Sequence, residues 1–159
     1  MQIQIVAIGK IRESYLREGI GVYSTRLSRL HKISLLDLPE ERISAKSSES
    51  EKRLAIEKEG RKLMAAAPDT SVIVALDPTG AILSSPELSA RIAEWELKGQ
   101  GNISFFIGGP FGLSPEVISH ADLVLSLSRM TFPHELVRLM LIEQIYRADC
   151  IRKGIPYHK

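Results

Sequence analysis

The chain has 159 residues, 44% of them hydrophobic, and a formal net charge of +2, and a chain of this length builds one hydrophobic core rather than two. A single cysteine, Cys150, excludes an internal disulfide framework, and four histidines without metal-ligand spacing predict no bound metal. No apolar run approaches the roughly 18 residues that span a bilayer, and Met1 runs directly into a predicted strand without a leader, so we expect a single cytoplasmic domain over residues 1–159 that makes no membrane contact.

Strands and helices alternate in the first half of the chain. A helix is predicted where apolar residues recur at spacings of four and three, at Leu16, Ile20, Tyr23, Leu27 and Leu30. The other predicted elements are strands at Gln2–Ile8, Ile33–Leu38 and Val72–Leu76, a mobile surface loop at 40–50 and a helix at Ser50–Ala66. The turn formers Asp77-Pro78-Thr79-Gly80 should end the third strand.

The second half continues this alternation. Ser85-Pro86 is typical of an N-cap followed by proline in the first helical turn, and Leu88, Ile92 and Trp95 give this helix one apolar stripe. The remaining predicted elements are strands at Ile103–Ile107 and Leu123–Leu127, a short helix between them, and a long helix from His134 to about Lys153.

The connections between successive strands are long enough to make the next strand parallel. The predicted fold class is therefore α/β, a mostly parallel sheet of about five strands flanked by helices. The last two strands end in turns rich in Gly, Ser, Thr and Pro, at 108–114 and 128–134. Open α/β sheets bind ligands at the carboxyl ends of their strands, so we expect the binding pocket between these turns.

The long C-terminal helix has apolar residues at nearly every angle around its axis. They are Leu136, Val137, Leu139, Met140, Leu141, Ile142, Ile145 and Tyr146. A helix that is apolar all round must be covered on all sides, and a symmetric partner chain is a common cover in a small protein. A homodimer through this helix is predicted. The alternative is that the sheet and neighbouring helices of the same chain cover it.

Basic residues cluster near the two ends of the chain. Near the N-terminus Glu13 and Glu18 are outnumbered by Lys10, Arg12, Arg17, Arg26, Arg29 and Lys32. Near the C-terminus Asp149 is outnumbered by Arg147, Arg152, Lys153 and Lys159. Such clusters can guide a phosphate backbone, but they are also common on solvated surfaces. Charge alone therefore allows nucleic-acid binding without favouring it.

The turn after the fourth strand is rich in glycine. The run Gly108-Gly109-Pro110-Phe111-Gly112 is not a P-loop, because no Gly-Lys-Ser/Thr follows, and it lacks the G-x-G-x-x-G spacing of a dinucleotide site. Glycines remove side chains where backbone must approach a ligand, and Pro110 makes the turn rigid. The alternative is simply a tight connection between strand and helix.

Several motifs, taken in order, resemble one protein family. They are Ile107-Gly108-Gly109-Pro110-Phe111-Gly112-Leu113-Ser114, Ser128-Arg129-Met130-Thr131-Phe132-Pro133-His134, Leu136-Val137-Arg138, Glu143-Gln144-Ile145-Tyr146-Arg147-Ala148 and the closing Pro156-Tyr157-His158-Lys159. Together they resemble the ribosomal RNA large-subunit methyltransferase H family of the SPOUT superfamily. The likeness covers essentially the whole chain and is strongest after residue 103.

The resemblance implies an activity, a cofactor and a fold. The family transfers methyl from S-adenosyl-L-methionine to N3 of a pseudouridine in large-subunit (23S) ribosomal RNA, acting on the assembled ribosome. Its members are homodimers with a C-terminal trefoil knot that forms the cofactor site, an exception to the rule that chains do not thread loops. The family's cofactor contacts map onto Leu76, Gly108, Leu127, Ser128, Arg129, Met130, Thr131 and Phe132.

Three residues are candidates for catalysis. The weakly acidic N3–H of a pseudouridine needs a base or a nearby cation. Tyr157 and His158 lie on a flexible C-terminal tail that the resemblance places against the partner's cofactor pocket; the alternative is a disordered tail. Arg138 could stabilise the developing anion or bind phosphate; the alternative is an ion pair with Glu143 or Asp149 across the dimer.

Two other functions stay open. One is an α/β enzyme that uses the glycine-rich turn for another nucleotide, and the other is a dimeric RNA-binding module without catalysis. The glycines, the Met130-Thr131 loop and the Tyr157-His158 tail together favour the methyltransferase. His134 is expected to cap the start of the long helix rather than to catalyse.

Overall fold

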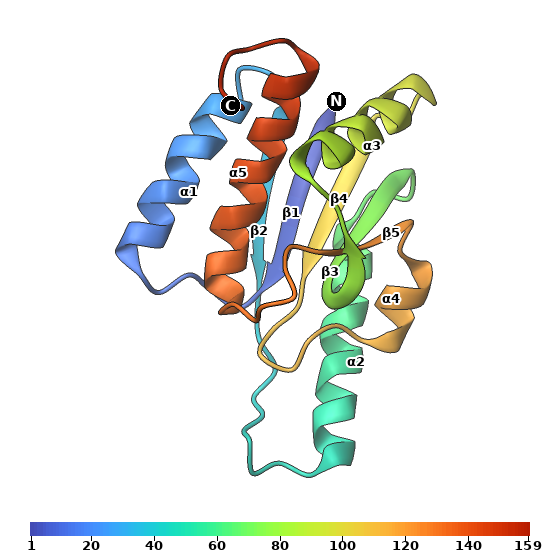
Figure 1. The fold of residues 1–159 in the computed structure, drawn as a ribbon. Helices are drawn as coiled ribbons and strands as arrows, with labels where there is room; N and C mark the ends of the chain where they lie inside the picture. Colours follow the sequence, from blue (N-terminus) through green and yellow to red (C-terminus); the bar gives the residue numbers. More distant parts are fainter.

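Strands and helices alternate along residues 1–159, all of which the computed structural model describes (Figure 1). The strands are β1 (Gln2–Ile8), β2 (Lys32–Leu38), β3 (Ser71–Ile82), β4 (Asn102–Ile107) and β5 (Leu123–Ser126). The helices are α1 (Ser14–Leu27), α2 (Glu49–Ala66), α3 (Ser85–Leu97), α4 (Pro115–His120) and α5 (His134–Arg152). Every predicted element is present, although Leu30 lies in the turn after α1.

The strands form one sheet in the order β2-β1-β4-β3-β5, and all of its pairings are parallel. Helices α1, α5 and α3 cover one face, and α2 and α4 cover the other (Figure 1). Side chains alternate between the faces as a pleated strand requires: Phe105 packs on the side of α5, and Phe106 packs on the side of α2. The predicted α/β class with a parallel sheet is confirmed.

Strand β3 differs from its prediction at the carboxyl end. The backbone N–H and hydroxyl of Thr79 donate to Oδ1 of Asp77 at 2.8 and 2.5 Å, so a turn does form. The strand then resumes, because Ala81 pairs with the same residue of β5, Leu125, that Leu76 pairs with. A β-carbon on Gly80 would lie 2.6 Å from the backbone of β5, so only glycine permits this close return. The prediction that the strand ends at Leu76 is wrong.

Two helix starts also differ from their predictions. The N-cap of α3 is Ser84, whose hydroxyl accepts the N–H of Glu87 while the Glu87 carboxylate accepts the N–H of Ser84 at 2.7 Å. This is a capping box, and Ser85 is already helical. At α5 the N-cap position is Pro133 and no side chain caps the helix, so the expectation that His134 caps it is wrong.

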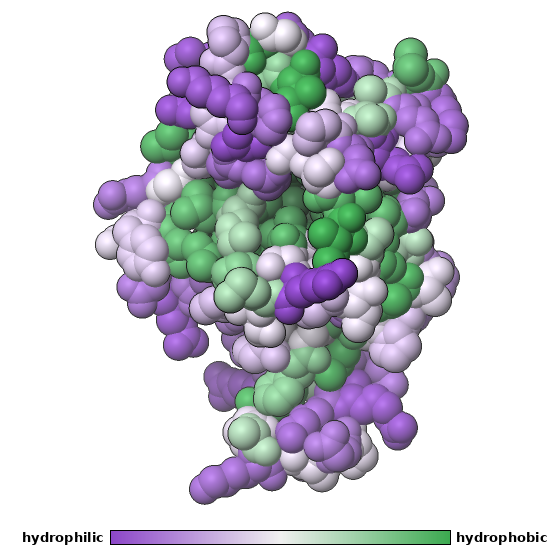
Figure 2. Space-filling view, in the orientation of Figure 1, coloured by the Kyte–Doolittle hydropathy of each residue, from purple (hydrophilic) through white to green (hydrophobic).

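Helix α5 lies between α1 and α3 with the sheet behind it (Figure 1). Leu141, Ile142 and Ile145 are fully buried by these elements, so cover within the chain accounts for most of the apolar circumference of the helix. Its outward face remains open. There Leu139 and Met140 line a groove of about 390 Å³ between α1 and α3, and Figure 2 shows apolar atoms gathered in a hollow over this part of the molecule.

No helix is both long and apolar enough to cross a bilayer.

Candidate active site

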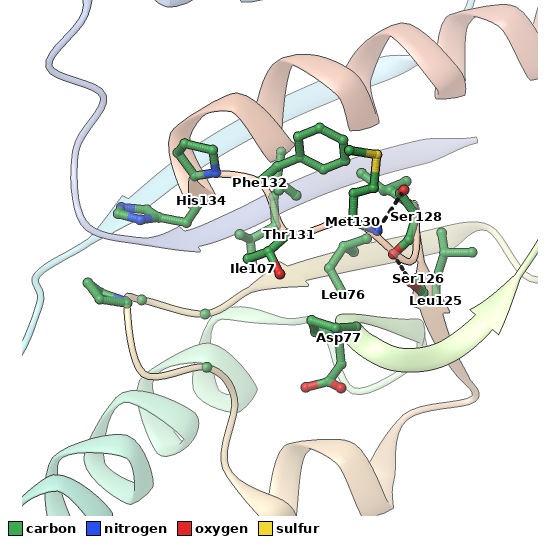
Figure 3. Close-up of a pocket in the computed structure, with 18 residues that line it drawn as sticks. Leu76, Asp77, Ile107, Leu125, Ser126, Ser128, Met130, Thr131, Phe132 and His134 are labelled. Atoms are coloured by element: carbon green, nitrogen blue, oxygen red, sulfur yellow. Dashed lines mark hydrogen bonds between the residues drawn. The ribbon is translucent and has the colours of Figure 1, made fainter.

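The carboxyl ends of β3, β4 and β5 enclose a cavity of about 370 Å³ (Figure 3). Its walls come from residues 76–78 of β3, from the end of β4 and the turn after it at 107–112, from the end of β5 and the loop after it at 125–134, and from Val137 of α5. Because parallel strands end at the same edge of the sheet, segments far apart in sequence meet here. The cavity lies between the two turns from which the sequence predicts a pocket.

The glycine-rich turn after β4 folds back tightly on itself. The N–H of Gly112 donates to the carbonyl of Gly109 at 3.0 Å, and Gly112 has a φ of +85°, which favours glycine. A β-carbon on Gly108 would lie 2.6 Å from the carbonyl carbon of Gly112. The space beside Gly108 is therefore filled by the turn's own backbone, and the glycine is needed for the turn to close.

The loop after β5 is fixed by two serines (Figure 3). The Ser126 hydroxyl donates to the carbonyl of Ser128 at 2.9 Å, and the Ser128 hydroxyl accepts the N–H of Met130 at 3.0 Å. The side chain of Met130 lies at the rim of the cavity and is 73% exposed. The backbone is thus held while an adaptable apolar side chain remains free at the entrance.

The expected cofactor contacts gather around this cavity with one exception. Seven of them line it, namely Leu76, Gly108, Leu127, Ser128, Met130, Thr131 and Phe132. Arg129 is exposed and lies outside the lining. Among the lining residues that the sequence did not single out for the site are Asp77 and His134. The available signal was their position, directly after the predicted strand Val72–Leu76 and at the end of the second predicted turn.

Arg138 lies outside the cavity and is held by the chain itself. It is only 4% exposed, and its guanidinium donates to Asp37 at 2.7 Å and to the carbonyls of Ile8 and Gly9 at 2.8 and 2.9 Å. Burial lowers the pKa of this guanidinium, while the Asp37 charge opposes that shift. The ion-pair partner is thus Asp37 of the same chain, not Glu143 or Asp149 across a dimer. The group ties α5 to the ends of β1 and β2.

We expect Arg138→Met to lower the free energy of unfolding by about 3 kcal/mol, because the buried carbonyls of Ile8 and Gly9 lose their donors. Urea unfolding checks this value. Arg91→Met is the matched control, since Arg91 forms only an exposed pair with Glu94 and should change stability by less than about 0.5 kcal/mol. A stable Arg138→Met protein that transfers no methyl group would instead place Arg138 in the chemistry.

The C-terminal tail is fixed against its own chain rather than free. The Tyr157 hydroxyl donates to Glu143 at 2.9 Å and lies 3.2 Å from the Tyr23 hydroxyl, and its ring packs edge-on against Tyr146 with centroids 5.0 Å apart. Burial raises the pKa of Tyr157, and both hydroxyl contacts raise it further, so the phenol stays protonated. The tail folds back along α5 so that the Tyr157 hydroxyl reaches Glu143 in the middle of the helix, and neither Tyr157 nor His158 lines the cavity.

Comparison with known proteins decides the family. The family model described as a predicted SPOUT methyltransferase matches residues 1–158. The chain belongs to the SPOUT methyltransferase family.

Full-length relatives narrow the placement within that family. The protein named ribosomal RNA large subunit methyltransferase H from Carboxydothermus hydrogenoformans is 46% identical over 159 residues, and its namesake from Clostridium novyi is 45% identical; each alignment covers all of both chains. A protein of Methanoregula boonei is 48% identical over the same full length. The resemblance to this branch of the SPOUT family is confirmed.

Proposed function

We propose that this protein transfers a methyl group from S-adenosylmethionine to N3 of a pseudouridine in large-subunit (23S) ribosomal RNA, acting on the assembled ribosome. The coarser function, methylation of large-subunit ribosomal RNA, follows from family membership and from relatives identical at 45% and more over the full length. The nucleotide and its N3 position rest on the family resemblance, and the cofactor rests on that resemblance and on the cavity described above.

The charge of the cavity lining carries the proposal. None of the 18 lining residues is lysine or arginine, and Asp77 is the one acidic residue among them. A site without cationic side chains suits the positively charged sulfonium of S-adenosylmethionine, and it offers the phosphates of other nucleotides no charged side-chain partner. The volume of about 370 Å³ is also within the usual range for a small-molecule site. These residues fit the cofactor, and they argue against the alternative of a phosphate-bearing nucleotide.

The residues of the cavity would bind and orient the cofactor, which supplies an activated methyl group. Leu76, Leu127 and Phe132 offer apolar walls for a flat ring, and the serine-fixed loop after β5 offers backbone hydrogen-bonding groups. Both the loop and the glycine-rich turn extend from strands of the central sheet, so they are rigid. Rigid placement of reactants is the main contribution a protein can make to a displacement reaction.

We infer further that the active unit is a homodimer in which the tail of one chain completes the cavity of the other. The open groove on α5 is the surface available for a partner. Glu143 and Tyr23, which contact the Tyr157 hydroxyl, also line that groove. A partner seated on the groove would therefore lie beside the tail. Since neither Tyr157 nor His158 lines the cavity of its own chain, we infer that they would act at the partner's cavity.

We also propose that the C-terminal part of the chain is knotted, as in the resembled family. The segment 127–133 leaves the edge strand β5 and returns to α5 on the middle of the sheet face (Figure 1). On the way it lines one cavity together with residues 76–78 of β3 and the turn that follows β4. This arrangement supports threading of the chain past those segments.

The test is transfer to ribosomes. Ribosomes from cells that lack the protein are incubated with the purified protein and S-adenosylmethionine, and the nucleosides of the large-subunit RNA are analysed by mass spectrometry. We expect one new methylpseudouridine, absent when the cofactor is omitted. An RNA-binding module without catalysis would bind the ribosomes and leave the nucleosides unchanged.

Gly108→Ala should weaken binding of S-adenosylmethionine by at least about tenfold, or 1.4 kcal/mol. The added β-carbon collides with the backbone of Gly112, so the turn must open and the cavity wall moves. Calorimetry with cofactor alone measures the affinity. Gly101→Ala is the matched control, because a β-carbon there meets nothing within 4 Å. Unchanged affinity in a folded Gly108→Ala protein would show that the turn is not part of the cofactor site.

A further inference from the structure

Only two of the residues that line the cavity have titratable side chains, Asp77 and His134. The Asp77 carboxylate is held in its turn by two hydrogen bonds from Thr79, and in Figure 3 it points away from Thr131 and Met130. His134 lies at one end of the cavity, in the first turn of α5 and just past the loop that follows β5. In the same view the His134 ring also points away from Thr131 and Met130. The imidazole is nevertheless the titratable lining group that no hydrogen bond holds in place.

The His134 ring has free nitrogens and open space beside it. Burial and neighbouring charges shift the pKa of the ring, and no hydrogen bond contributes to that shift. Its Nε2 lies 3.7 Å from the point that a β-carbon on Gly9 would occupy, and Glu40 and Arg138 lie 3.4 and 3.9 Å from the same point. Gly9 has a φ of +85° and no side chain, so this space remains open next to the imidazole.

The surroundings keep the imidazole neutral. Burial is the main cause that lowers the pKa of His134, and the Arg138 charge lowers it further, with a smaller effect of Arg12 in the same direction. Glu135 and Glu40 oppose the shift without reversing it. A neutral imidazole at pH 7 can accept a proton, and a nearby guanidinium favours release of that proton afterwards.

We propose that His134 is the general base that removes the N3 proton of the target pseudouridine, an inference that rests on the methyl transfer proposed above. The proton passes from N3 to an imidazole nitrogen. The electron pair left on N3 forms the bond to the methyl carbon as the bond from that carbon to sulfur breaks, and the pair of the broken bond stays on sulfur. The imidazolium then gives its proton to water, which restores the neutral ring.

The test compares the unmodified protein with His134→Gln in single-turnover methylation of ribosomes at saturating cofactor across a range of pH. The rate of the unmodified protein should rise with pH and level off above the pKa of His134, below the ordinary value of about 6.5. His134→Gln should be slower by about 10² to 10³ at neutral pH. Its rate should keep rising with pH, because solvent must then take the proton.

Two measurements do not depend on activity. NMR titration of the imidazole in the cofactor-free protein should show His134 titrating below the ordinary histidine value of about 6.5. Calorimetry should give His134→Gln a cofactor affinity within about threefold of the original, or about 0.7 kcal/mol. His120→Gln is the matched control, since His120 is exposed on α4 and its ring contacts the carbonyl of Glu116 outside the cavity. That variant should keep the original rate and pH profile.

A full rate in His134→Gln, or a plateau that persists in its pH profile, would overturn the assignment, and so would an NMR titration at or above the ordinary histidine value. Failure of the proposed function looks different. In that case the unmodified protein itself would not bind S-adenosylmethionine or methylate ribosomes, whereas failure of this inference leaves both intact.

Discussion

Deleting Tyr157–Lys159 is expected to remove most methyl transfer while leaving the affinity for S-adenosylmethionine nearly unchanged. The cavity is built by chain segments at the edge of the sheet, and none of residues 157–159 lines it. Loss of the tail therefore leaves the cavity walls intact. We expect the single-turnover rate to fall about 100-fold or more, as for loss of a positioned catalytic group, with cofactor affinity by calorimetry changed less than about threefold.

A mixing experiment shows which chain the tail serves. Tail-deleted protein has an intact cavity, and the Gly108→Ala protein has an intact tail. If the tail completes the partner's cavity, co-refolded mixtures of the two contain heterodimers with one complete site and recover part of the activity. No recovery would mean that each tail serves its own chain. A tail-deleted protein that methylates at the full rate would remove Tyr157 and His158 from the chemistry altogether.

Met140→Glu should convert the protein from dimer to monomer at micromolar concentration. Met140 lines the open apolar groove on the outward face of α5, and a carboxylate buried there without a partner costs several kcal/mol. At about 1.4 kcal/mol per tenfold change, the dimer dissociation constant should rise at least about 100-fold. Sedimentation velocity over a dilution series measures this change.

The control for Met140→Glu places the same charge elsewhere. Leu97 at the end of α3 is 89% exposed and lies outside the groove, so Leu97→Glu should leave the dimer intact. Circular dichroism of both variants checks that the fold is kept. The dimer proposal fails if the unmodified protein sediments as a well-folded monomer, or if Met140→Glu dimerises as tightly as Leu97→Glu.

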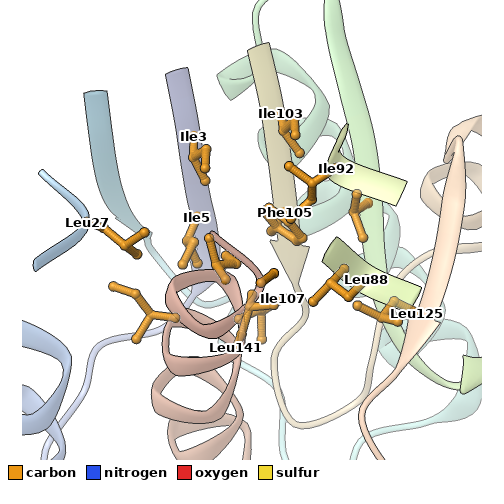
Figure 4. Close-up of a cluster of buried hydrophobic side chains, with 14 of the residues drawn as sticks. Ile3, Ile5, Leu27, Leu88, Ile92, Ile103, Phe105, Ile107, Leu125 and Leu141 are labelled. Carbon is orange, nitrogen blue, oxygen red and sulfur yellow. The ribbon is translucent and has the colours of Figure 1, made fainter. Parts of the chain in front are cut away.

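Much of the fold was predictable because periodicity reports burial directly. Ile3 and Ile5 alternate along β1, and Ile103 and Phe105 alternate along β4, so each pair points to the same face of the sheet (Figure 4). In the pairing of β1 with β4, Ile3 lies beside Ile103 and Ile5 lies beside Phe105. A period of two in a strand and the spacing of an apolar helical stripe are local properties, and local reasoning suffices for them.

The departures come from contacts between distant segments. Turn formers at 77–80 give a true local signal, but whether the strand resumes afterwards depends on β5, more than 40 residues later in the chain, and on the missing side chain of Gly80. Likewise the partner of Arg138 is on β2. No spacing within the C-terminal helix can indicate Asp37.

The candidate site divides in the same way. The seven lining residues expected for the cofactor could be predicted from the sequence, because the family resemblance and the strand ends both indicate the same edge of the sheet. The role we infer for His134 was not, because it depends on Gly9 leaving space beside the ring. Arg138 lies four residues after His134 on the same helix, so its nearness follows from the spacing, whereas Gly9 follows β1 and only the folded chain brings it to the ring.

The order of the strands also bears on how the chain folds during its synthesis. β1 lies in the interior of the sheet between β2 and β4. Ile3 therefore cannot pair with Ile103 until β4 has been synthesised, about 100 residues later. The helix that covers this face, α5, is made last. Until then the growing chain exposes apolar strand surface and an unpaired strand edge, which invite aggregation and chaperone binding. A product that terminates before residue 134 is therefore expected to be an aggregation-prone fragment, not a smaller folded protein.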